Sequence, residues 1–318
     1  MKKILGKERI FNFLVSSFRQ NKLSHAYLFL GPEGVGKAFT AKLFAQFINC
    51  ERRESFPCLK CGPCVKIEEN RHPDVYWIKP EEGSQGIKIE VVRSLQEKIA
   101  LKPYEAGYKI FILEKADSLL EEASHCLLKT LEEPPGDALL ILLAEEKERI
   151  FPTILSRCQI IRFSLINRTL VEEFLMEKGV KEKSKISFYS NLAGGSIGKA
   201  LALVEGDYLK KRNLVFDGLL EKKDFNYEVW GKEKTVFSET IDFLSGVFRD
   251  ALFKKLGLDR LMFNIDHKDL ISRLASSYSQ ADLAELLEKL NFYYQLIQQN
   301  VNLRLIFTNL EMDLDRQR

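Results

Sequence analysis

Short apolar runs alternate with amphipathic stretches along the first half of the chain. Five of these runs are bounded by polar residues, glycine or proline, as buried strands are, and they cover residues 26–30, 75–78, 110–113, 139–143 and 160–163. Apolar residues at helical spacing cover residues 9–19, 38–47, 90–99 and 118–131. Strands that alternate with helices predict an α/β fold in which helices cover both faces of a parallel sheet over residues 1–166.

The strand pattern stops after Leu165. Helical spacing marks residues 170–177, 185–191 and 197–204, and then, to the end of the chain, apolar positions such as Leu283, Leu286 and Leu290 repeat every three or four residues. This pattern predicts two helical parts. The expected domains are therefore a core over residues 1–166, a small helical lid domain over 167–207 and a C-terminal helical bundle over 208–318.

Composition and charge narrow the class of protein. The 318 residues are 45% hydrophobic and 29% charged, which excludes a disordered chain. The net charge of +3 is too small and too dispersed for a chain that binds DNA alone with high affinity. No apolar run approaches the ~20 residues that span a bilayer, and Lys7, Glu8 and Arg9 interrupt the place of a signal peptide's apolar stretch. We therefore expect a cytoplasmic protein without a membrane partner.

A glycine-rich loop follows the first predicted strand. Residues 31–38 read Gly-Pro-Glu-Gly-Val-Gly-Lys-Ala, and they fit the pattern G-x-x-x-x-G-K at the start of a predicted helix. In this pattern backbone N–H groups surround phosphate oxygens. The candidate ligands of ATP or ADP are Gly31, Gly34, Gly36 and Lys37. The next residue ordinarily supplies a hydroxyl to Mg²⁺, and Ala38 has none, so the loop fits either a phosphate site or a strand-to-helix turn that binds nothing.

The acidic position after the third predicted strand is altered as well. Residues 114–117 read Glu-Lys-Ala-Asp, where ATP-hydrolysing proteins of this type have Asp-Glu. Lys115 stands in the place of the carboxylate that orients and deprotonates the attacking water, and an ammonium group cannot accept that proton. Glu114 still offers a carboxylate to a metal ion. We therefore expect no ATP hydrolysis by this chain.

Four of the six cysteines lie close together: Cys50, Cys58, Cys61 and Cys64. In the cytoplasm such a set is not a disulfide framework, and its spacing is typical of a structural Zn²⁺ site. An iron–sulfur cluster also takes four thiolates, but nothing in the sequence indicates redox work, and a catalytic zinc is excluded because no fourth position is open. Pro57 and Pro63 predict that no helix runs through this zinc module, which covers about residues 50–64.

The first half contains six recognisable segments: 21–29 (NKLSHAYLF), the glycine loop, 102–104 (KPY), 107–109 (GYK), 127–135 (LLKTLEEPP) and 152–158 (PTILSRC). In this order they resemble the AAA+ clamp-loader subunits of bacterial DNA polymerase III, over most of residues 1–166. The changes at Ala38 and Lys115, with Ser-Arg-Cys retained at 156–158, look like the delta-prime branch of that family and unlike its ATP-hydrolysing motor subunits.

The resemblance implies a heteropentamer of clamp-loader subunits that opens the ring-shaped sliding clamp and places it on primer-template DNA. It also implies an AAA+ P-loop core, a lid domain and a C-terminal collar domain. Two sensor sites depart from the family. Lys199 stands where an Arg is usual in the second nucleotide sensor, and Glu145 and Glu146 stand where a Thr or Asn senses the γ-phosphate. Both departures further weaken the case for hydrolysis.

Arg157 lies between Pro152 and the last predicted strand, at the surface end of the sheet. A planar guanidinium there can reach a γ-phosphate bound by a neighbouring subunit, and such trans-acting arginines accelerate hydrolysis about 10³- to 10⁵-fold. The residues alone favour a surface ion pair with Glu145 or Glu148. The resemblance favours the trans-acting role.

The sequence thus predicts a non-hydrolysing accessory subunit of the clamp loader that helps to load the sliding clamp and supplies Arg157 to a neighbouring ATPase subunit. One alternative is an active AAA+ ATPase motor subunit of a clamp loader or a related DNA-remodelling complex, which would need Ser or Thr at position 38 and Glu at position 115. The other is a zinc-dependent DNA-binding module, which would need more basic and aromatic residues around the cysteines than Arg52, Arg53 and Lys60.

Overall fold

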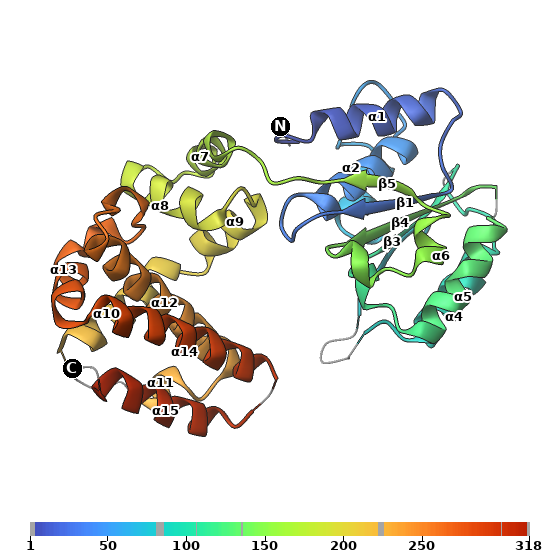
Figure 1. Ribbon diagram of the computed structural model, residues 1–318. Helices are drawn as coiled ribbons and strands as arrows, with labels where there is room; N and C mark the ends of the chain where they lie inside the picture. Colours follow the sequence, from blue (N-terminus) through green and yellow to red (C-terminus); the bar gives the residue numbers. More distant parts are fainter. Residues whose placement is uncertain are drawn as a thin grey trace. The chain divides into compact units, whose positions relative to one another are not determined.

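The structure is a computed structural model that describes residues 4–80, 86–105, 107–134, 136–221, 226–299 and 301–316. Its first half contains a sheet of five parallel strands, β1 (Ala26–Leu30), β2 (Val75–Ile78), β3 (Lys109–Leu113), β4 (Ala138–Ala144) and β5 (Gln159–Arg162) (Figure 1). Their order in the sheet is β2-β3-β4-β1-β5. The predicted α/β fold is confirmed, because every residue of the central strands β1, β3 and β4 is buried, as an uninterrupted apolar run requires.

Two groups of helices cover the sheet. The first group is α1 (Glu8–Arg19) and α2 (Lys37–Asn49), and the second is α4 (Ile89–Ile99), α5 (Glu121–Glu132) and α6 (Pro152–Leu155) (Figure 1). Tyr27 and Phe29 of β1 belong to the core under α1 and α2, whereas Leu28 belongs to the core under α4 and α5. Successive residues of a strand point to opposite faces, so each apolar run supplies both cores.

The strand register brings the candidate nucleotide residues to one edge of the sheet. Leu30 at the end of β1 pairs with Ala144 at the end of β4, and Leu113 at the end of β3 pairs with Leu142. The glycine loop, Glu114 and Glu145 directly follow these strand ends. The four cysteines lie toward the opposite edge, because α2 runs back from the glycine loop and ends at Asn49, before Cys50.

The rest of the chain is helical in its described part. The helices are α7 (Arg168–Glu177), α8 (Lys183–Ala193), α9 (Ile197–Glu205), α10 (Tyr208–Glu221), α11 (Tyr227–Trp230), α12 (Lys234–Lys255), α13 (Lys268–Ser277), α14 (Gln280–Gln298) and α15 (Leu303–Arg316). Short 3₁₀ turns cover Ala116–Ser118, Lys147–Arg149, Asp259–Leu261 and Ile265–His267. In the C-terminal part, Phe237 and Phe248 of α12 share one buried core with Leu286 of α14 and Phe307 of α15. Among the described residues, no helix combines the length and the apolar character that crossing a membrane requires.

The residues form two compact units. The first, the sheet unit, comprises Met1–Val180 and Ala193–Leu201, and the second, the bundle unit, comprises Lys181–Leu192 and Ala202–Arg318. The chain therefore leaves the sheet unit after Val180 and returns to it for the start of α9. The finer division into domains at 1–166, 167–207 and 208–318 stays a prediction.

Candidate functional site

The glycine loop connects β1 to α2. Gly36 has a φ of 97° immediately before Lys37, the first residue of α2, and this left-handed conformation favours glycine. Gly31 packs against the chain that follows β5, where a Cβ would come within 2.0 Å of the carbonyl oxygen of Phe163. The structure thus has the strand, loop and helix around Gly31, Gly34, Gly36 and Lys37 that the sequence predicted.

The ammonium group of Lys37 is held by the loop itself. Lys37 is only 9% exposed, and its Nζ donates to two backbone carbonyl oxygens of the loop, one of them that of Pro32 at 2.7 Å. Burial lowers the pKa of Lys37, while the charges of Glu145, Asp117 and Glu33 act in the opposite direction. A phosphate group would have to replace the carbonyl partners of Lys37 and would meet three negative charges nearby.

The two positions at which the sequence departs from ATP-hydrolysing proteins of this type, 38 and 115, are both exposed. Ala38 lies on the first turn of α2, whereas the hydroxyl of Thr40 is buried on another face of this helix and cannot replace the missing metal ligand. Lys115 follows β3 with a φ of 53°. The carboxylate of Glu114 lies 3.2 Å from Nζ of Lys79. Positions 38 and 115 therefore offer neither a hydroxyl to a metal ion nor a carboxylate to activate a water molecule.

Asp117, which the sequence analysis left without a role, organises the same edge of the sheet. Its Oδ2 accepts the backbone N–H groups of Glu145 at 2.8 Å and of Glu146 at 3.1 Å. This contact fixes the turn after β4, the position that the resemblance assigned to a γ-phosphate sensor. Burial raises the pKa of Glu145, and the charge of Lys37 partly offsets this effect. The signal in the sequence was an acidic residue just after Lys115.

The first turn of α9 closes over the glycine loop. The backbone N–H of Gly198 donates to the carbonyl oxygen of Gly34 at 2.8 Å, and Oγ of Ser196 donates to that of Glu33 at 3.0 Å. The two backbones touch, because a Cβ on Gly34 would lie 3.1 Å from Cα of Gly198 and only 2.3 Å from Oγ of Ser196. Lys199, at the position that the resemblance assigned to a second nucleotide sensor, is exposed. We call these contacts the loop clasp; they join the loop to α9 directly, with protein atoms alone.

Arg157 lies between α6 and β5, where the sequence placed it. Its Nη1 donates to the carbonyl oxygen of Thr153 at 3.0 Å and to Oγ of Ser156 at 3.1 Å. Its Nη2 lies 2.7 Å from Oε1 of Glu132, the last residue of α5, and about a third of the Arg157 side chain (35%) is exposed. The guanidinium thus has an acidic partner, but that partner is neither Glu145 nor Glu148.

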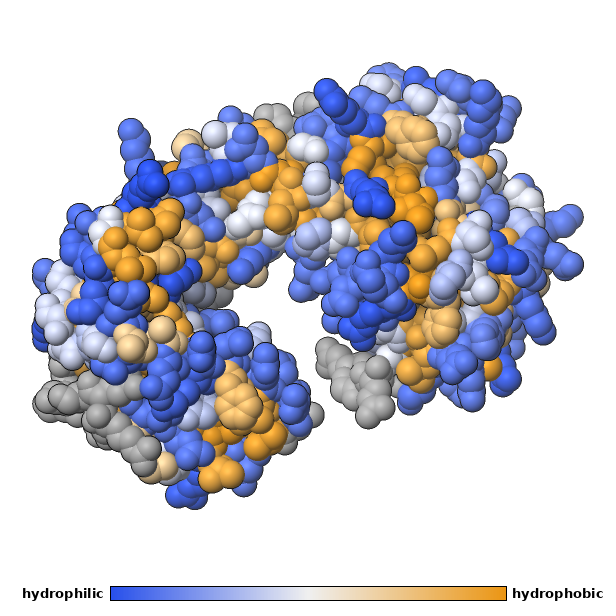
Figure 2. All heavy atoms as spheres, in the orientation of Figure 1, coloured by the Kyte–Doolittle hydropathy of each residue, from blue (hydrophilic) through white to orange (hydrophobic). Residues whose placement is uncertain are grey.

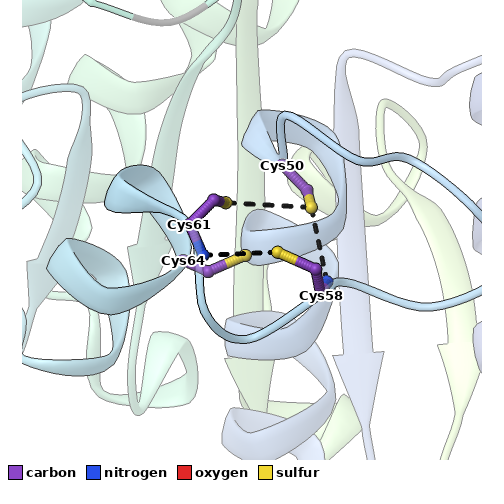
Figure 3. A group of neighbouring side chains, drawn as sticks. All are labelled: Cys50, Cys58, Cys61 and Cys64. Carbon is purple, nitrogen blue, oxygen red and sulfur yellow. Dashed lines mark hydrogen bonds between the residues drawn. The ribbon is translucent and has the colours of Figure 1, made fainter.

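The four cysteine thiols converge on one point (Figure 3). They come from the end of α2, from the following loop, and from α3 (Gly62–Glu68), and their sulfur atoms all lie within 4.8 Å of one another. A tetrahedral Zn²⁺ site with Zn–S bonds of ~2.3 Å has sulfur atoms about 3.8 Å apart. The separation between Cys50 and Cys61, 3.9 Å, fits this geometry. The cluster can therefore hold a metal ion.

Backbone N–H groups support the sulfur atoms. The N–H groups of Arg52 and Cys58 donate to Sγ of Cys50, and that of Cys61 donates to Sγ of Cys58, each at 3.3 Å. Donors from Lys60 and Cys61 lower the pKa of the Cys58 thiol to about 6, whereas burial raises the pKa of Cys64. Backbone donors of this kind stabilise thiolates, the form that binds metal.

One expectation for this segment was wrong. Helix α3 begins at Gly62 and includes Cys64, although Pro63 predicted that no helix would run here. Pro63 occupies the first turn, where a backbone N–H has no intrahelical acceptor, so the missing N–H costs nothing. His72 accepts the N–H of Asp74 at its Nδ1 and is not one of the grouped ligands.

The loop between the cysteines packs on α1. The ring of Phe56 lies 5.5 Å from that of Phe11, the guanidinium of Arg53 lies 5.6 Å from the ring centre of Phe18, and Arg19 donates to the carbonyl oxygen of Glu54. Helix α3 packs on α2, where Nε2 of Gln46 donates to the carbonyl oxygen of Cys64 at 2.9 Å. The four thiols therefore hold together a segment that packs on both α1 and α2, the helices on one face of the sheet.

Comparisons with known proteins agree on one family. A family model described as "DNA polymerase III, delta subunit" matches residues 6–167, and one described as "DNA polymerase III, delta subunit, C terminal" matches residues 207–314. DNA polymerase III subunit delta' of Bacillus subtilis is 30% identical over 96% of this chain and 95% of its own length. Subunit tau of the same bacterium is 28% identical over 96% of this chain, which covers 59% of tau. The solved structure of a gamma subunit-related protein of Thermotoga maritima is 16% identical and aligns with a TM-score of 0.51. The alignment covers 96% of this chain and 99% of the Thermotoga chain, and at this identity it shows the fold alone.

Proposed function

Because the chain belongs to the delta-type subunits of the bacterial DNA polymerase III clamp loader, we propose that it is a delta-prime accessory subunit that does not itself hydrolyse ATP. The observation that carries this proposal is the state of the glycine loop. Lys37 is bound to the loop's own carbonyl groups, and neither Ala38 nor Lys115 offers the oxygen that hydrolysis requires. ATP or ADP bound at this loop would not be hydrolysed by this chain.

The second part of the proposal is that Arg157 acts on a nucleotide held by a neighbouring subunit. The Arg157 side chain lies at the surface beside the edge strand β5. Its two neighbours in the Ser-Arg-Cys motif have structural roles. Ser156 contacts the guanidinium, and Cys158 is buried in the core beneath it. Hydrophobic side chains gather over the part of the sheet unit where β5 and α6 lie (Figure 2), which suits contact with another subunit.

The thiol cluster is proposed to be a structural zinc site held by Cys50, Cys58, Cys61 and Cys64. The convergence of four sulfur atoms and the backbone donors to two of them support Zn²⁺. The arrangement leaves no coordination position for a substrate, so its role is stability of the loop on α1 and α2. An enzyme that uses this metal for catalysis is not supported.

The partners proposed for the chain are the other subunits of a clamp-loader heteropentamer, and through them the sliding clamp and primer-template DNA. We assign residues 167–207 to a lid domain and 208–318 to a collar domain that joins the subunits. The bundle unit, with its own core around α12 and α14, is suited to an assembly role separate from the sheet. We place the complex in the cytoplasm.

Reconstitution tests this proposal. The purified chain is incubated with ATP and Mg²⁺ and phosphate release is measured, and then the remaining clamp-loader subunits are assembled with and without it and clamp loading on primed DNA is measured. We expect no phosphate release from the chain alone and loading only when it is present. Phosphate release that Lys37→Ala abolishes would instead identify an active motor subunit. Full clamp loading without the chain would show that it is not a required subunit of the clamp loader.

A further inference from the structure

The contact between Arg157 and Glu132 contributes little to the stability of the fold. Nη2 of Arg157 lies 2.7 Å from Oε1 of Glu132, yet these side chains are 35% and 49% exposed. Ion pairs with this much solvent around them contribute little to the free energy of unfolding. The pair is therefore better understood by what it does to the guanidinium.

The position of Glu132 is unfavourable for the helix that carries it. Glu132 is the last residue of α5, where the carbonyl ends of the helix give a partial negative charge, and Lys129 is the basic residue of that last turn. A carboxylate here is repelled by its own helix. The nearby guanidinium of Arg157 compensates for this repulsion, which ties the two side chains to each other.

We propose that Glu132 is a positioning residue for Arg157, so that the guanidinium is oriented before a neighbouring subunit's phosphate reaches it. Thr153 and Ser156 hold the Nη1 side through bonds of 3.0 and 3.1 Å, and Glu132 holds Nη2 from a different helix. Contacts at both Nη1 and Nη2 fix the plane of the Arg157 guanidinium. The contacts at Nη1 alone would leave the guanidinium free to rotate. Nε takes no part in these three contacts.

Fixing the plane matters because an arginine side chain loses much rotamer freedom when it binds. An arginine that is already oriented loses less at the transition state, where the contact with phosphate is made. Removing the support should therefore lower kcat for the neighbour's ATP hydrolysis more than it changes KM for ATP. This inference rests on the proposed trans-acting role of Arg157.

The test compares Glu132→Ala, Glu132→Gln, Arg157→Ala and the double variant Glu132→Ala/Arg157→Ala in the reconstituted complex, with kcat and KM for ATP as readouts. We expect Glu132→Ala to lower kcat about three- to tenfold, and Glu132→Gln to stay within about twofold of the unchanged chain because its amide oxygen still accepts from Nη2. The double variant should equal Arg157→Ala, since Glu132 acts only through Arg157. The matched control is Glu122→Ala, at the opposite end of the same helix.

Three outcomes would contradict the inference. If Arg157→Ala lowers kcat for ATP and Glu132→Ala leaves kcat unchanged, Glu132 does not position the arginine. If Glu132→Ala lowers kcat further in the Arg157→Ala background, it acts by another route. If Arg157→Ala itself has normal kinetics, the trans-acting role fails first, and the positioning role fails with it.

Discussion

The backbones of Gly34 and Gly198 touch. The N–H of Gly198 donates to the carbonyl oxygen of Gly34 at 2.8 Å, and a Cβ built on Gly198 would lie only 2.6 Å from Cα of Gly34. A loop whose glycines ordinarily approach phosphate here approaches the start of α9 instead. The glycines thus have a structural use that does not depend on a nucleotide.

Gly34→Ala should destabilise the sheet unit by about 1–3 kcal/mol. The new Cβ would meet Oγ of Ser196 at 2.3 Å, and the φ of +72° is itself strained for alanine. Urea unfolding in a Trp230→Phe background measures this unit alone, because the remaining tryptophan, Trp77, lies in β2. Gly107→Ala is the control, since nothing lies within 4 Å of its Cβ. Equal stability of the two variants would argue against the loop clasp.

Restoring the two lost side chains should not restore ATP hydrolysis. In Ala38→Thr/Lys115→Glu, the ammonium of Lys37 is still bound to loop carbonyls and Glu145 still stands beside it, near the place of a γ-phosphate. We expect phosphate release at background level. Turnover that disappears on adding Lys37→Ala would show that the two positions were the whole difference from an active subunit.

Purified protein should contain one zinc ion per chain. Cys61→Ser removes one of four thiolates, so we expect loss of the metal and a fall of the thermal midpoint by at least ~5 °C, because metal binding contributes to folding. Metal analysis and thermal unfolding with and without a chelator measure both effects. Cys126→Ser is the control, since Cys126 bonds to Gln96 outside the cluster. Four freely titratable thiols in metal-free native protein would contradict the zinc site.

Arg157→Ala should leave folding and assembly intact and reduce ATP-dependent clamp loading, by a factor that approaches ~10³ at the affected site. Arg157→Lys should fail nearly as badly, because a point charge cannot reproduce the planar fork. Loading and ATP turnover by the reconstituted complexes decide the matter. A surface ion pair predicts the reverse result, normal loading with a small change in stability.

The sheet unit should lose stability as pH falls below neutrality, in part through His72. Burial lowers the pKa of His72 in the folded chain below its usual 6.5, so the unfolded chain binds the proton more readily. The contribution of neutral His72 to the free energy of unfolding is therefore complete above pH ~6.5, and it is lost as pH falls below that value. His72→Asn keeps an acceptor for the N–H of Asp74 and should flatten the pH dependence of urea unfolding between pH 7.5 and 5.5. The exposed His125, changed to Asn, is the comparison, and an equal slope in both variants would contradict this role.

The elements that the sequence predicted well are those fixed by local pattern. The strand at 75–78 and the helix that carries Lys37 depend on apolar spacing and a glycine turn, and both form as expected. The four thiols converge because their short spacings leave little choice once a loop forms. Helix α3 was missed because Pro63 breaks helices in general but not in their first turn.

What the sequence did not predict depends on contacts between distant segments. Asp117 contacts the turn after β4 only because the register of β3 and β4 brings the two strand ends together. The partner of Arg157 follows from the packing of α5 beside α6, so Glu132 could not be distinguished from other nearby acids by spacing. Pairs of this kind carry no periodic signal along the chain.

The path of the chain between the two units has a consequence for truncated forms of the protein. A fragment that ends at Val180 retains all five strands but lacks Ser196 and Gly198, so the tip of the glycine loop loses its cover. A fragment that extends to Leu201 keeps that cover and carries α8 with it. Buried rings of α8, those of Phe188 and Tyr189, would then face water without the bundle unit and promote aggregation. No single cut therefore yields an intact, soluble sheet unit, and limited proteolysis should release fragments that precipitate or bind to one another.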